Sequence, residues 1–463
     1  MSEAIGEMIL PGTYIEVRSE GLIGVGGIST GNIGIVGTAN KGPIGQVTIL
    51  GSYSEALDAF GSYDRWATTG NPLTLTRALE QVFKGGGSTV YAVRIANGDP
   101  ASMAWSVSGE PAAVLFTLTA TSPGSWANGI KVSLKDDTLT VELGRVKETF
   151  TGADAKTLAA EVNSGSRLVK ASTPADADLG KEPKSVAVVA ADAGTDGANA
   201  TTVEAKAGLD LLATQNIQIV TVAGMDAKTI GGTIVGHLEA TENDGKERLA
   251  LVGASNDDVK KIGDDDASAL SNARVILVAP GLLADDAART EANKQVKLPA
   301  AYSAALMAGR LSTLAPHISL TNKDVAADGL TKEYTRAEQK QLLNNRVLVL
   351  QKNLGIRVLK GISTDTGAFR QISVRRIVDY AKAGVRIGSN PYIGKLNNPR
   401  VRAALKATLD GFLAGMVVDE MLIGYQLDVS ATRAQEINGQ ALVTMTLQPT
   451  FSIDYIKVIM NLS

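Results

Sequence analysis

Three glycines stand close together between Gly31 and Gly37, in the segment GNIGIVG, and glycine-rich loops are a common cradle for phosphate groups. The segment does not have the G-x-G-x-x-G order of a dinucleotide-binding loop. Gly42 is followed by Pro43, where a phosphate-binding loop has lysine. We therefore predict a tight turn between strands, and keep a nucleotide site as the alternative.

Residue types that bind metal ions are few or unsuitably spaced. His237 and His317 are the only histidines, and neither belongs to an H-E-x-x-H motif. The chain has no cysteine, which excludes disulfides, thiol catalysis and zinc sites built on thiolates. The consecutive carboxylates Asp264–Asp266 lack the alternating spacing and central glycine of a calcium loop, so we expect a solvated turn there. We predict no metal site and no cofactor.

Other classes of function find little support in the residues. No evident nucleophile is paired with a base, so we predict no catalytic residues and no enzyme activity. The net charge of −3 is spread over interspersed residues, whereas nucleic-acid-binding domains usually carry a basic face. The sequence also lacks the run of roughly 18 apolar residues that a membrane-spanning helix needs. Residues 1–10 lack the basic start and apolar stretch of a signal peptide, so we expect no nucleic-acid partner, no membrane insertion and no secretion by that route.

The elements that carry these residues indicate several domains. With 463 residues the chain exceeds one ordinary domain of roughly 100–200 residues. Its 48 glycines, against 7 phenylalanines and 3 tryptophans, indicate many tight turns and short strands. We expect an α/β and α+β multidomain protein.

Strand-like and helix-like segments alternate along residues 21–97 and again along 198–296, which favours one α/β domain. Between them, residues 98–197 are rich in alternating strands broken by turn residues. We interpret residues 98–197 as an inserted β-rich domain.

Residues 297–449 predict a C-terminal domain with a strand pair near 347–359 and a long helix from about 373 to 383. Asn398 and Pro399 are a helix start signal. The strands Glu420–Val429 and Ala441–Leu447, joined through Asn438-Gly439, predict a hairpin. The helix that starts at Pro399 is expected to bury one apolar face and to expose a basic one, which with a residue just before it comprises Lys395, Arg400, Arg402 and Lys406.

An isolated amphipathic strand is predicted in each terminal segment, residues 1–20 and 450–463. Ile15 and Val17 alternate with polar residues after a Pro-Gly turn and before a glycine-rich stretch. In the last segment, alternation places Ile456, Val458, Met460 and Leu462 on one face.

These segments resemble the contractile tail sheath family of myovirus-type phages, R-type pyocins and related injection systems. The resemblance lies in the order and spacing of PGTYIEV, GNIGIVGTANKGPIG, YSEALDAFG, GGGSTVYAVRI, PGSWANGIKVSL, AGLDLL, IQIVTVAG, ISVRRIVDYAKAG and QPTFSIDYIKVIM. The stretch AGTDG at residues 193–197 departs from the family's GGTDG, and LAPHISLTNKDV replaces its aromatic-rich central segment.

The resemblance implies an α/β sheath core, an inserted outer domain, and an inner, tube-facing C-terminal domain completed by strands from other subunits. Strand exchange adds backbone hydrogen bonds between subunits, and flexible linkers leave the bodies free to move. The hairpin 420–447 is the expected acceptor. The residues carried over as exchanged strands are Tyr14, Ile15, Glu16 and Val17, and Tyr455, Ile456, Val458, Met460 and Leu462.

By the same resemblance, subunits form hexameric rings that stack helically around a tail tube, and the lattice contracts from a metastable extended state. The expected partners are further copies of the chain, the tail tube protein, and baseplate and tail terminator proteins. The expected location is the virion tail, assembled in the bacterial cytoplasm. The sheath of a pyocin-like or extracellular injection particle and, more remotely, an α/β nucleotide-binding enzyme are the alternatives.

Overall fold

The computed structural model describes residues 27–67, 73–98, 101–109, 113–174, 188–197 and 199–461. The strand predicted at Tyr14–Val17 and the predicted strand residue Leu462 lie outside these residues. The described chain divides into two compact units. We call residues 31–314 and 320–370 the α/β unit, and residues 27–30, 315–319 and 371–461 the C-terminal unit.

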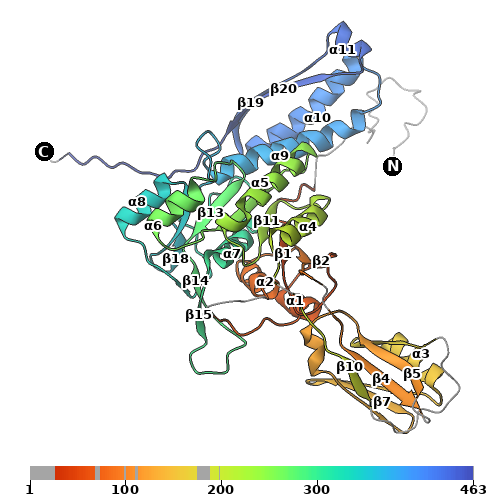
Figure 1. The fold of residues 1–463 in the computed structure, drawn as a ribbon. Helices are drawn as coiled ribbons and strands as arrows, with labels where there is room; N and C mark the ends of the chain where they lie inside the picture. The colour runs from red at the N-terminus through yellow and green to blue at the C-terminus, as the bar shows by residue number, and fades with distance from the viewer. Residues whose placement is uncertain are drawn as a thin grey trace, which may run out of the picture. The chain divides into compact units, whose positions relative to one another are not determined.

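The α/β unit is built on an eight-stranded sheet in the order β18-β17-β13-β12-β11-β1-β3-β2 (Figure 1). The six strands from β17 to β3 are parallel, and the two edge strands are antiparallel to their neighbours. Their bounds are β1 Ile33–Gly37, β2 Val47–Leu50, β3 Val90–Arg94, β11 Ile219–Val222, β12 Leu249–Gly253, β13 Val275–Ala279, β17 Val347–Lys352 and β18 Ile356–Val358.

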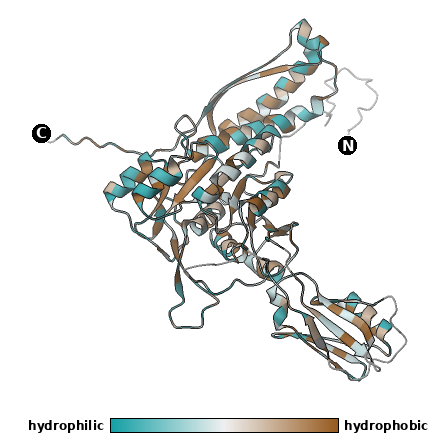
Figure 2. Ribbon diagram, in the orientation of Figure 1, coloured by the Kyte–Doolittle hydropathy of each residue, from teal (hydrophilic) through white to brown (hydrophobic). Residues whose placement is uncertain are grey.

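The inner strands are short runs of apolar residues that are buried throughout β1, β11, β12 and β13. Continuous apolar runs are typical of parallel strands with both faces covered, and these strands are among the hydrophobic parts of the ribbon (Figure 2). The helices are α1 Tyr53–Phe60, α2 Leu75–Lys84, α4 Thr202–Ala213, α5 Ala227–Asn243, α6 Val259–Lys261, α7 Ala300–Ser312 and α8 Arg336–Asn344. A small sheet in the order β15-β14-β16 completes this framework, with β14 at Leu282–Asp285, β15 at Gln295–Leu298 and β16 at Gly329–Leu330.

Between β3 and α4 the chain forms a separate arrangement of strands with a core of its own. One sheet has the order β10-β4-β5-β9 and the other β6-β7-β8. We call residues 98–197 the inserted domain. Its elements are β4 Ala104–Gly109, β5 Ala113–Ala120, a 3-10 helix Ser125–Gly129, β6 Lys131–Lys135, β7 Thr138–Leu143, β8 Val146–Thr151, α3 Ala155–Gly165, β9 Val169–Ser172 and β10 Val189–Asp192.

The C-terminal unit packs two long helices against a two-stranded antiparallel sheet (Figure 1). The second helix begins as expected: Asn398 caps it by accepting a 2.9 Å hydrogen bond from the amide of Val401, and Pro399 is its first residue. The elements are α9 Ile372–Ser389, a 3-10 turn Asn390–Tyr392, α10 Pro399–Val418, β19 Leu422–Ser430, α11 Arg433–Ile437 and β20 Leu442–Pro449.

Two features differ from the sequence-based expectation. The strand pair near 347–359 was expected in the C-terminal domain, but β17 pairs with β13 and the α/β unit continues to residue 370. The physical reason is that β17 starts with four buried apolar residues, which a parallel sheet accommodates. The connection of the hairpin is also longer than expected, because helix α11 precedes Asn438 and Gly439.

No helix among the described residues combines the length and the apolar character that crossing a membrane requires.

Candidate functional site

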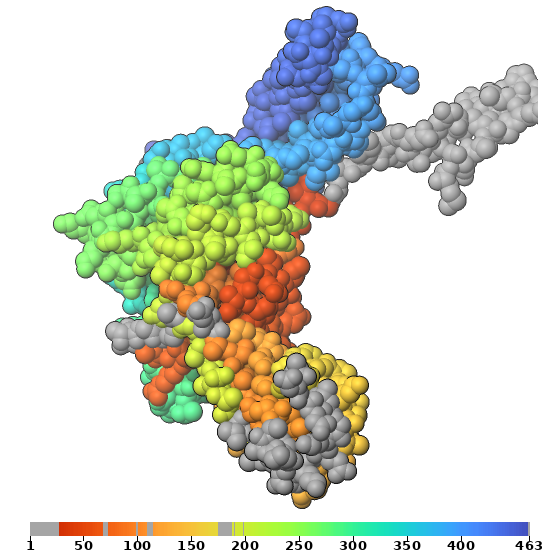
Figure 3. Space-filling view, turned by 45° about the vertical axis from the view of Figure 1, so that its right-hand side comes forward, coloured from red at the N-terminus to blue at the C-terminus, as the bar shows by residue number. Residues whose placement is uncertain are grey.

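The hairpin β19–β20 has one face turned to the helices of the C-terminal unit. In register, Tyr425 stands opposite Leu447 and Leu427 opposite Met445. These four side chains pack against the buried cluster of α9 and α10, yet each remains partly exposed. Figure 3 shows the helices and the hairpin of this unit, in shades of blue, packed side by side. The packing of this two-stranded sheet against the two helices therefore leaves the inner face of the hairpin partly exposed.

Both strands of this hairpin also have an open edge within the described part of the chain, because the sheet consists of β19 and β20 alone. An open edge presents unpaired backbone donors and acceptors, which favour the addition of another strand. The hairpin thus has the geometry of an acceptor on two sides.

Residues 451–461 follow β20 as an arm that belongs to no helix or strand and leads away from the hairpin (Figure 1). We call these residues the C-terminal arm. Exposed large hydrophobic side chains recur along it, with exposed fractions of 59% to 85%: Phe451, Ile453, Tyr455, Ile456, Val458, Ile459 and Met460. Such an apolar surface is costly in water and marks an interaction site.

The base of the arm is held by the side-chain amide of Gln371. Its Oε1 accepts from the amide of Ser452 at 3.2 Å, and its Nε2 donates to the carbonyl of Ser452 at 3.4 Å and to Oδ2 of Asp454 at 3.0 Å. The side chain pairs with Ser452 much as a neighbouring strand would. The point of departure of the arm is therefore defined, while the apolar residues beyond it stay exposed.

Alternation along the arm is apolar on both faces, and the sequence interpretation recognised only part of this. It named Tyr455 and the residues of the even-numbered face but passed over Phe451, Ile453 and Ile459. The signal was present for Phe451 and Ile453, which alternate with polar Ser452 and Asp454, whereas Ile459 lies between Val458 and Met460. A strand with two apolar faces fits a place where both faces become covered.

The predicted basic face of α10 is only partly free. Arg400 is exposed, and Lys395 lies over the ring of Tyr392 with Nζ 4.9 Å from the ring centroid. Lys406 is exposed and forms an ion pair with Asp428 at 3.4 Å. The expectation that Arg402 is exposed is wrong: its side chain is 13% exposed and lies 2.9 Å from the carboxylate of Glu436.

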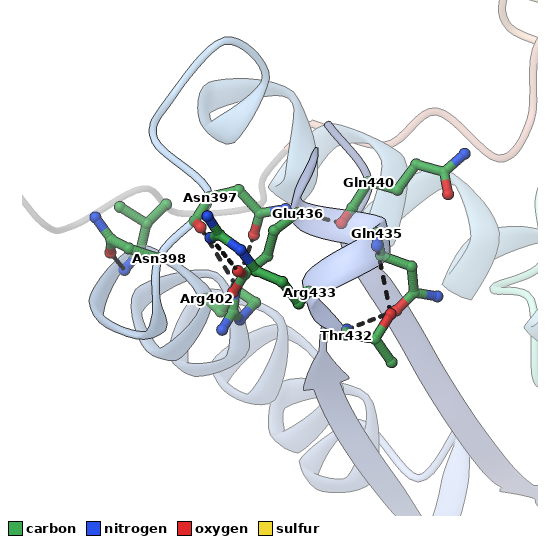
Figure 4. A network of polar contacts seen from close by, with 9 residues as sticks. Asn397, Asn398, Arg402, Thr432, Arg433, Gln435, Glu436 and Gln440 are labelled. Carbon is green, nitrogen blue, oxygen red and sulfur yellow. Dashed lines mark hydrogen bonds and ion pairs between the residues drawn. The ribbon is translucent and has the colours of Figure 1, made fainter. Parts of the chain in front are cut away.

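Figure 4 shows the network that holds Arg402 in the first turn of α10. Nη1 of Arg402 donates to Oδ1 of Asn397 at 2.8 Å as well as to Glu436, and Asn397 in turn donates to the carbonyl of Gln440 at 2.8 Å. Glu436 also accepts from Arg433 at 3.1 Å. Arg433 and then Arg402 lower the pKa of Glu436, so its carboxylate stays charged between two cations.

This network ties the α10 start to α11 and leaves a net positive charge, since one carboxylate faces two guanidinium groups. Sequence reasoning missed Arg433, whose side chain is 84% exposed. The available signal was the pattern Thr432-x-x-Gln435, a capping box in which Thr432 and Gln435 bond each other's backbone amides.

The segments considered for catalysis or metal binding have structural roles. The tight turn predicted at Gly31–Gly37 is wrong, because residues 33–37 of this segment form the buried strand β1; a Cβ at Gly37 would crowd Ala223 and Leu75. Residues 27–31 have the spacing G-x-S-x-G, but they precede a strand, whereas a nucleophile elbow joins a strand to a helix. This arrangement gives no support to the enzyme alternative.

The expectation of a solvated turn at Asp264–Asp266 is wrong for Asp266. These residues lie in a π-helical turn Ile262–Ala267, and Asp266 is 1% exposed and accepts from the amide and hydroxyl of Ser255 at 2.9 and 3.0 Å. Burial raises its pKa. Among the residues that the structure describes, no group of three or more acidic or histidine side chains is placed to hold a metal ion.

Two sequence comparisons relate this chain to known proteins. Residues 364–463 match the family model of the phage tail sheath C-terminal domain. Over 256 residues the chain is 24% identical to the tail sheath protein of Mycobacterium phage Bxz1, a match that covers 51% of this chain and 42% of that protein. The resemblance to contractile tail sheath proteins is confirmed. The chain spans less than half the length of this curated relative.

Solved sheath structures share the fold of nearly the whole chain. The sheath tail protein of Desulfitobacterium hafniense has a TM-score of 0.65 at 16% identity, over 95% of this chain and 100% of that one. The helical sheath of the anti-feeding prophage in its contracted state has a TM-score of 0.57 at 16% identity, over 98% and 99% of the two chains. The chain therefore has the mixed α/β fold of sheath proteins.

Proposed function

We propose that this chain is the structural subunit of a contractile tail sheath, which polymerises around a tail tube and contracts to drive the tube through a host envelope. The observation that carries the proposal is the pairing of an incomplete hairpin sheet with an exposed apolar arm in the same C-terminal unit. The sheath family match at residues 364–463 covers both features.

Strand exchange would satisfy the hairpin and the arm together. A strand from another copy at an edge of β19 or β20 would pair the open backbone and cover the half-buried inner face. Full burial of a Val, Ile, Phe or Met side chain contributes about 1.5–3 kcal/mol, so a few residues of the arm suffice for a persistent link. The proposed exchanged residues of the arm are Tyr455, Ile456, Val458, Met460 and Leu462.

The strand Tyr14–Val17 is the proposed donor for the second open edge. With two donors and two edges per subunit, each copy connects to several others, as a lattice of stacked hexameric rings requires. Contraction then consists of reorientation of the linked bodies from a metastable extended lattice to one with more buried contact area, without a cofactor.

The basic residues at the start of α10 are proposed to contact acidic groups of the tail tube. Lys395 and Arg400 are exposed, and the Arg402–Glu436–Arg433 network adds positive charge nearby. The exposed ammonium group of Lys406 is the fourth proposed contact, although Asp428 pairs with it within the subunit. Exposed ion pairs contribute only about 0–1 kcal/mol each, so they can break one after another as the sheath moves. Baseplate and terminator proteins are the further proposed partners, in a virion tail assembled in the bacterial cytoplasm.

A sheath of a pyocin-like or extracellular injection particle is the second candidate. The fold similarity to the anti-feeding prophage sheath favours it, whereas the sequence similarity to a phage tail sheath protein favours the virion. Both candidates require the same subunit chemistry.

The arm is tested by replacing Ile456, Val458 and Met460 with Asp in the full chain. We expect loss of rings and helical tubes in electron micrographs, because three charges cannot be buried in an exchanged strand. The matched control carries the same change at Ile49, Val203 and Leu354, which are exposed by 61%, 71% and 93% but lie in the α/β unit. Polymers that form equally well from the arm variant and from the control would refute strand exchange by the arm.

A further inference from the structure

The side chain of Arg94 lies where the chain leaves the α/β sheet for the inserted domain. Arg94 is the last residue of β3 and is fully buried. Its Nη1 donates to the carbonyl of Gly42 at 2.7 Å and to the carbonyl of Pro123 at 2.7 Å. The first carbonyl belongs to the loop after β1 and the second to the inserted domain, where Ser122 also accepts from the amide of Gly42 at 3.0 Å. One guanidinium group thus bridges sheet and insertion.

The returning segment of the inserted domain is fastened to the same turn. Oδ1 and Oδ2 of Asp196 accept from the amide and hydroxyl of Ser125 at 2.7 and 2.6 Å. Asn128 exchanges two hydrogen bonds with the backbone of Gly194, at 2.7 and 2.9 Å. Burial lowers the pKa of Arg94 to about 10, while the charge of Asp196 acts in the opposite direction. The segment that enters the inserted domain after β3 and the segment that returns from it therefore interact electrostatically at this turn.

Packing at this point leaves no room for side chains or for sliding. A Cβ on Gly124 would overlap the carbonyl oxygen of Asn40, and a Cβ on Gly194 would overlap that of Gly124. The ammonium group of Lys41 lies 5.1 Å from the ring centroid of Trp126. Backbone from the sheet loop, the outgoing turn and the returning segment is stacked in direct contact.

The sequence motifs GTANKGPIG, PGSWANG and AGTDG supply these contacts, although residues 37, 123 and 193 at which they begin are far apart in the chain. None of the three motifs takes part in the hairpin or the arm. Their meeting around Arg94 indicates a shared role that the sequence order alone does not reveal.

We propose that Arg94 is a positioning residue that locks the inserted domain onto the eight-stranded sheet of the α/β unit, so that both turn as one body when a subunit reorients. The lock rests on the contacts at Arg94, and only its use during contraction rests on the proposed sheath function. A rigid lock makes the inserted domain follow every rotation of the sheet, whereas a flexible linker would let the domain and the sheet rotate independently.

The test compares Arg94→Met with Arg248→Met by hydrogen exchange in the full chain. Both arginines are buried, and Arg248 likewise donates to backbone carbonyls, those of Leu212 and Ala213, but away from the inserted domain. In Arg94→Met we expect the hydrogen exchange rate of peptides spanning 122–129 and 193–197 to rise about tenfold or more. The reason is that the loss of hydrogen bonds from a charged group makes local opening of these segments more favourable. In Arg248→Met these peptides should exchange as in the parent chain.

Equal exchange of these peptides in Arg94→Met and the parent, or an equal rise in both variants, would overturn the lock. Asp196→Asn provides a second route if Arg94→Met does not fold, since it removes the charge partner on the returning segment; faster exchange at 193–197 is expected, and unchanged exchange would count against the proposal. Absence of helical polymers from the parent chain in electron micrographs would refute the sheath function while leaving the lock intact.

Discussion

The buried guanidinium group of Arg248 lies where the backbone carbonyls of α4 end. Arg248 is 1% exposed and donates to Leu212 and Ala213, the last residues of α4, at 3.1 and 3.2 Å. Cations at this end of a helix satisfy free carbonyl groups and the helix dipole. Its Nη1 also lies 3.2 Å from Nε2 of His237, which must accept because a guanidinium has only donors.

His237 is consequently held neutral, and this predicts a dependence of stability on pH. Burial, followed by the charge of Arg248, lowers its pKa to about 4, while Asp210 raises the pKa and Lys206 lowers it by smaller amounts. The folded pKa lies below the unfolded value of about 6.5, so the contribution to stability is complete above pH 6.5 and is lost as the pH falls towards 4.

Between pH 7 and pH 5 we expect the free energy of unfolding to fall by about 2 kcal/mol through this group. In urea denaturation of His237→Gln, the free energy of unfolding should fall by about 2 kcal/mol less between pH 7 and pH 5 than in the parent, since the amide does not titrate. The window lies above the pKa of ordinary carboxylates, which keeps them out of the comparison. Parallel pH profiles of the variant and the parent would contradict the assignment.

At the scale of elements, the crossing of α2 and α7 depends on glycine. Gly309 of α7 faces the end of α2, and a Cβ there would overlap the backbone carbonyl of Val82 and approach Gly85 closely. The helix α7 is buried along nearly its whole length beneath the sheet. Close backbone contact allows this helix to fit between α2 and the strands.

Gly309→Ala and Gly236→Ala should therefore shift stability in opposite directions. Overlap with backbone in a packed core is expected to cost Gly309→Ala about 1–3 kcal/mol or more. Gly236 lies exposed in α5 with open space around it, so alanine is expected to add about 0.5–1 kcal/mol by its higher helix propensity. Thermal unfolding followed by circular dichroism measures both, and a Gly309→Ala variant as stable as the parent would contradict the close backbone contact between α7 and α2.

At the scale of the whole molecule, two kinds of intermolecular contact are proposed, and they respond differently to salt. Exchanged strands depend on backbone hydrogen bonds and apolar burial, which salt does not screen. The tube contact depends on exposed charges, and the Debye length falls from about 10 Å at 0.1 M salt to about 3 Å at 1 M.

We therefore expect 1 M NaCl to release sheath from the tube without dissolving sheath polymers, as measured by co-sedimentation and electron microscopy. Arg400→Glu should produce the same release at low salt, whereas Lys260→Glu, an exposed change in the α/β unit, should not. Tube binding that is equal at both salt concentrations and in both variants would contradict the charge contact and leave strand exchange unaffected.

Local sequence was sufficient for many elements, because their signals lie within a few residues. Asn398 with Pro399 determines the start of α10, and the apolar alternation of β19 and β20 determines which face is turned inward. The exposed arm follows from alternation without a neighbouring partner strand. The resemblance to sheath proteins was likewise carried by ordered local motifs.

The tertiary structure alone decided which distant residues meet. β17 pairs with β13 in the large sheet rather than lying in the C-terminal unit, and Asp266 is buried against Ser255. Arg402 contacts Glu436, which is 34 positions away in the chain. Three separate motifs meet around Arg94. Each of these contacts depends on closing a loop of chain, and the free energy of closure is balanced by packing that involves the whole unit. The local sequence pattern does not contain the free energies of loop closure and packing. It therefore predicts the helices and strands but not which of their residues come into contact.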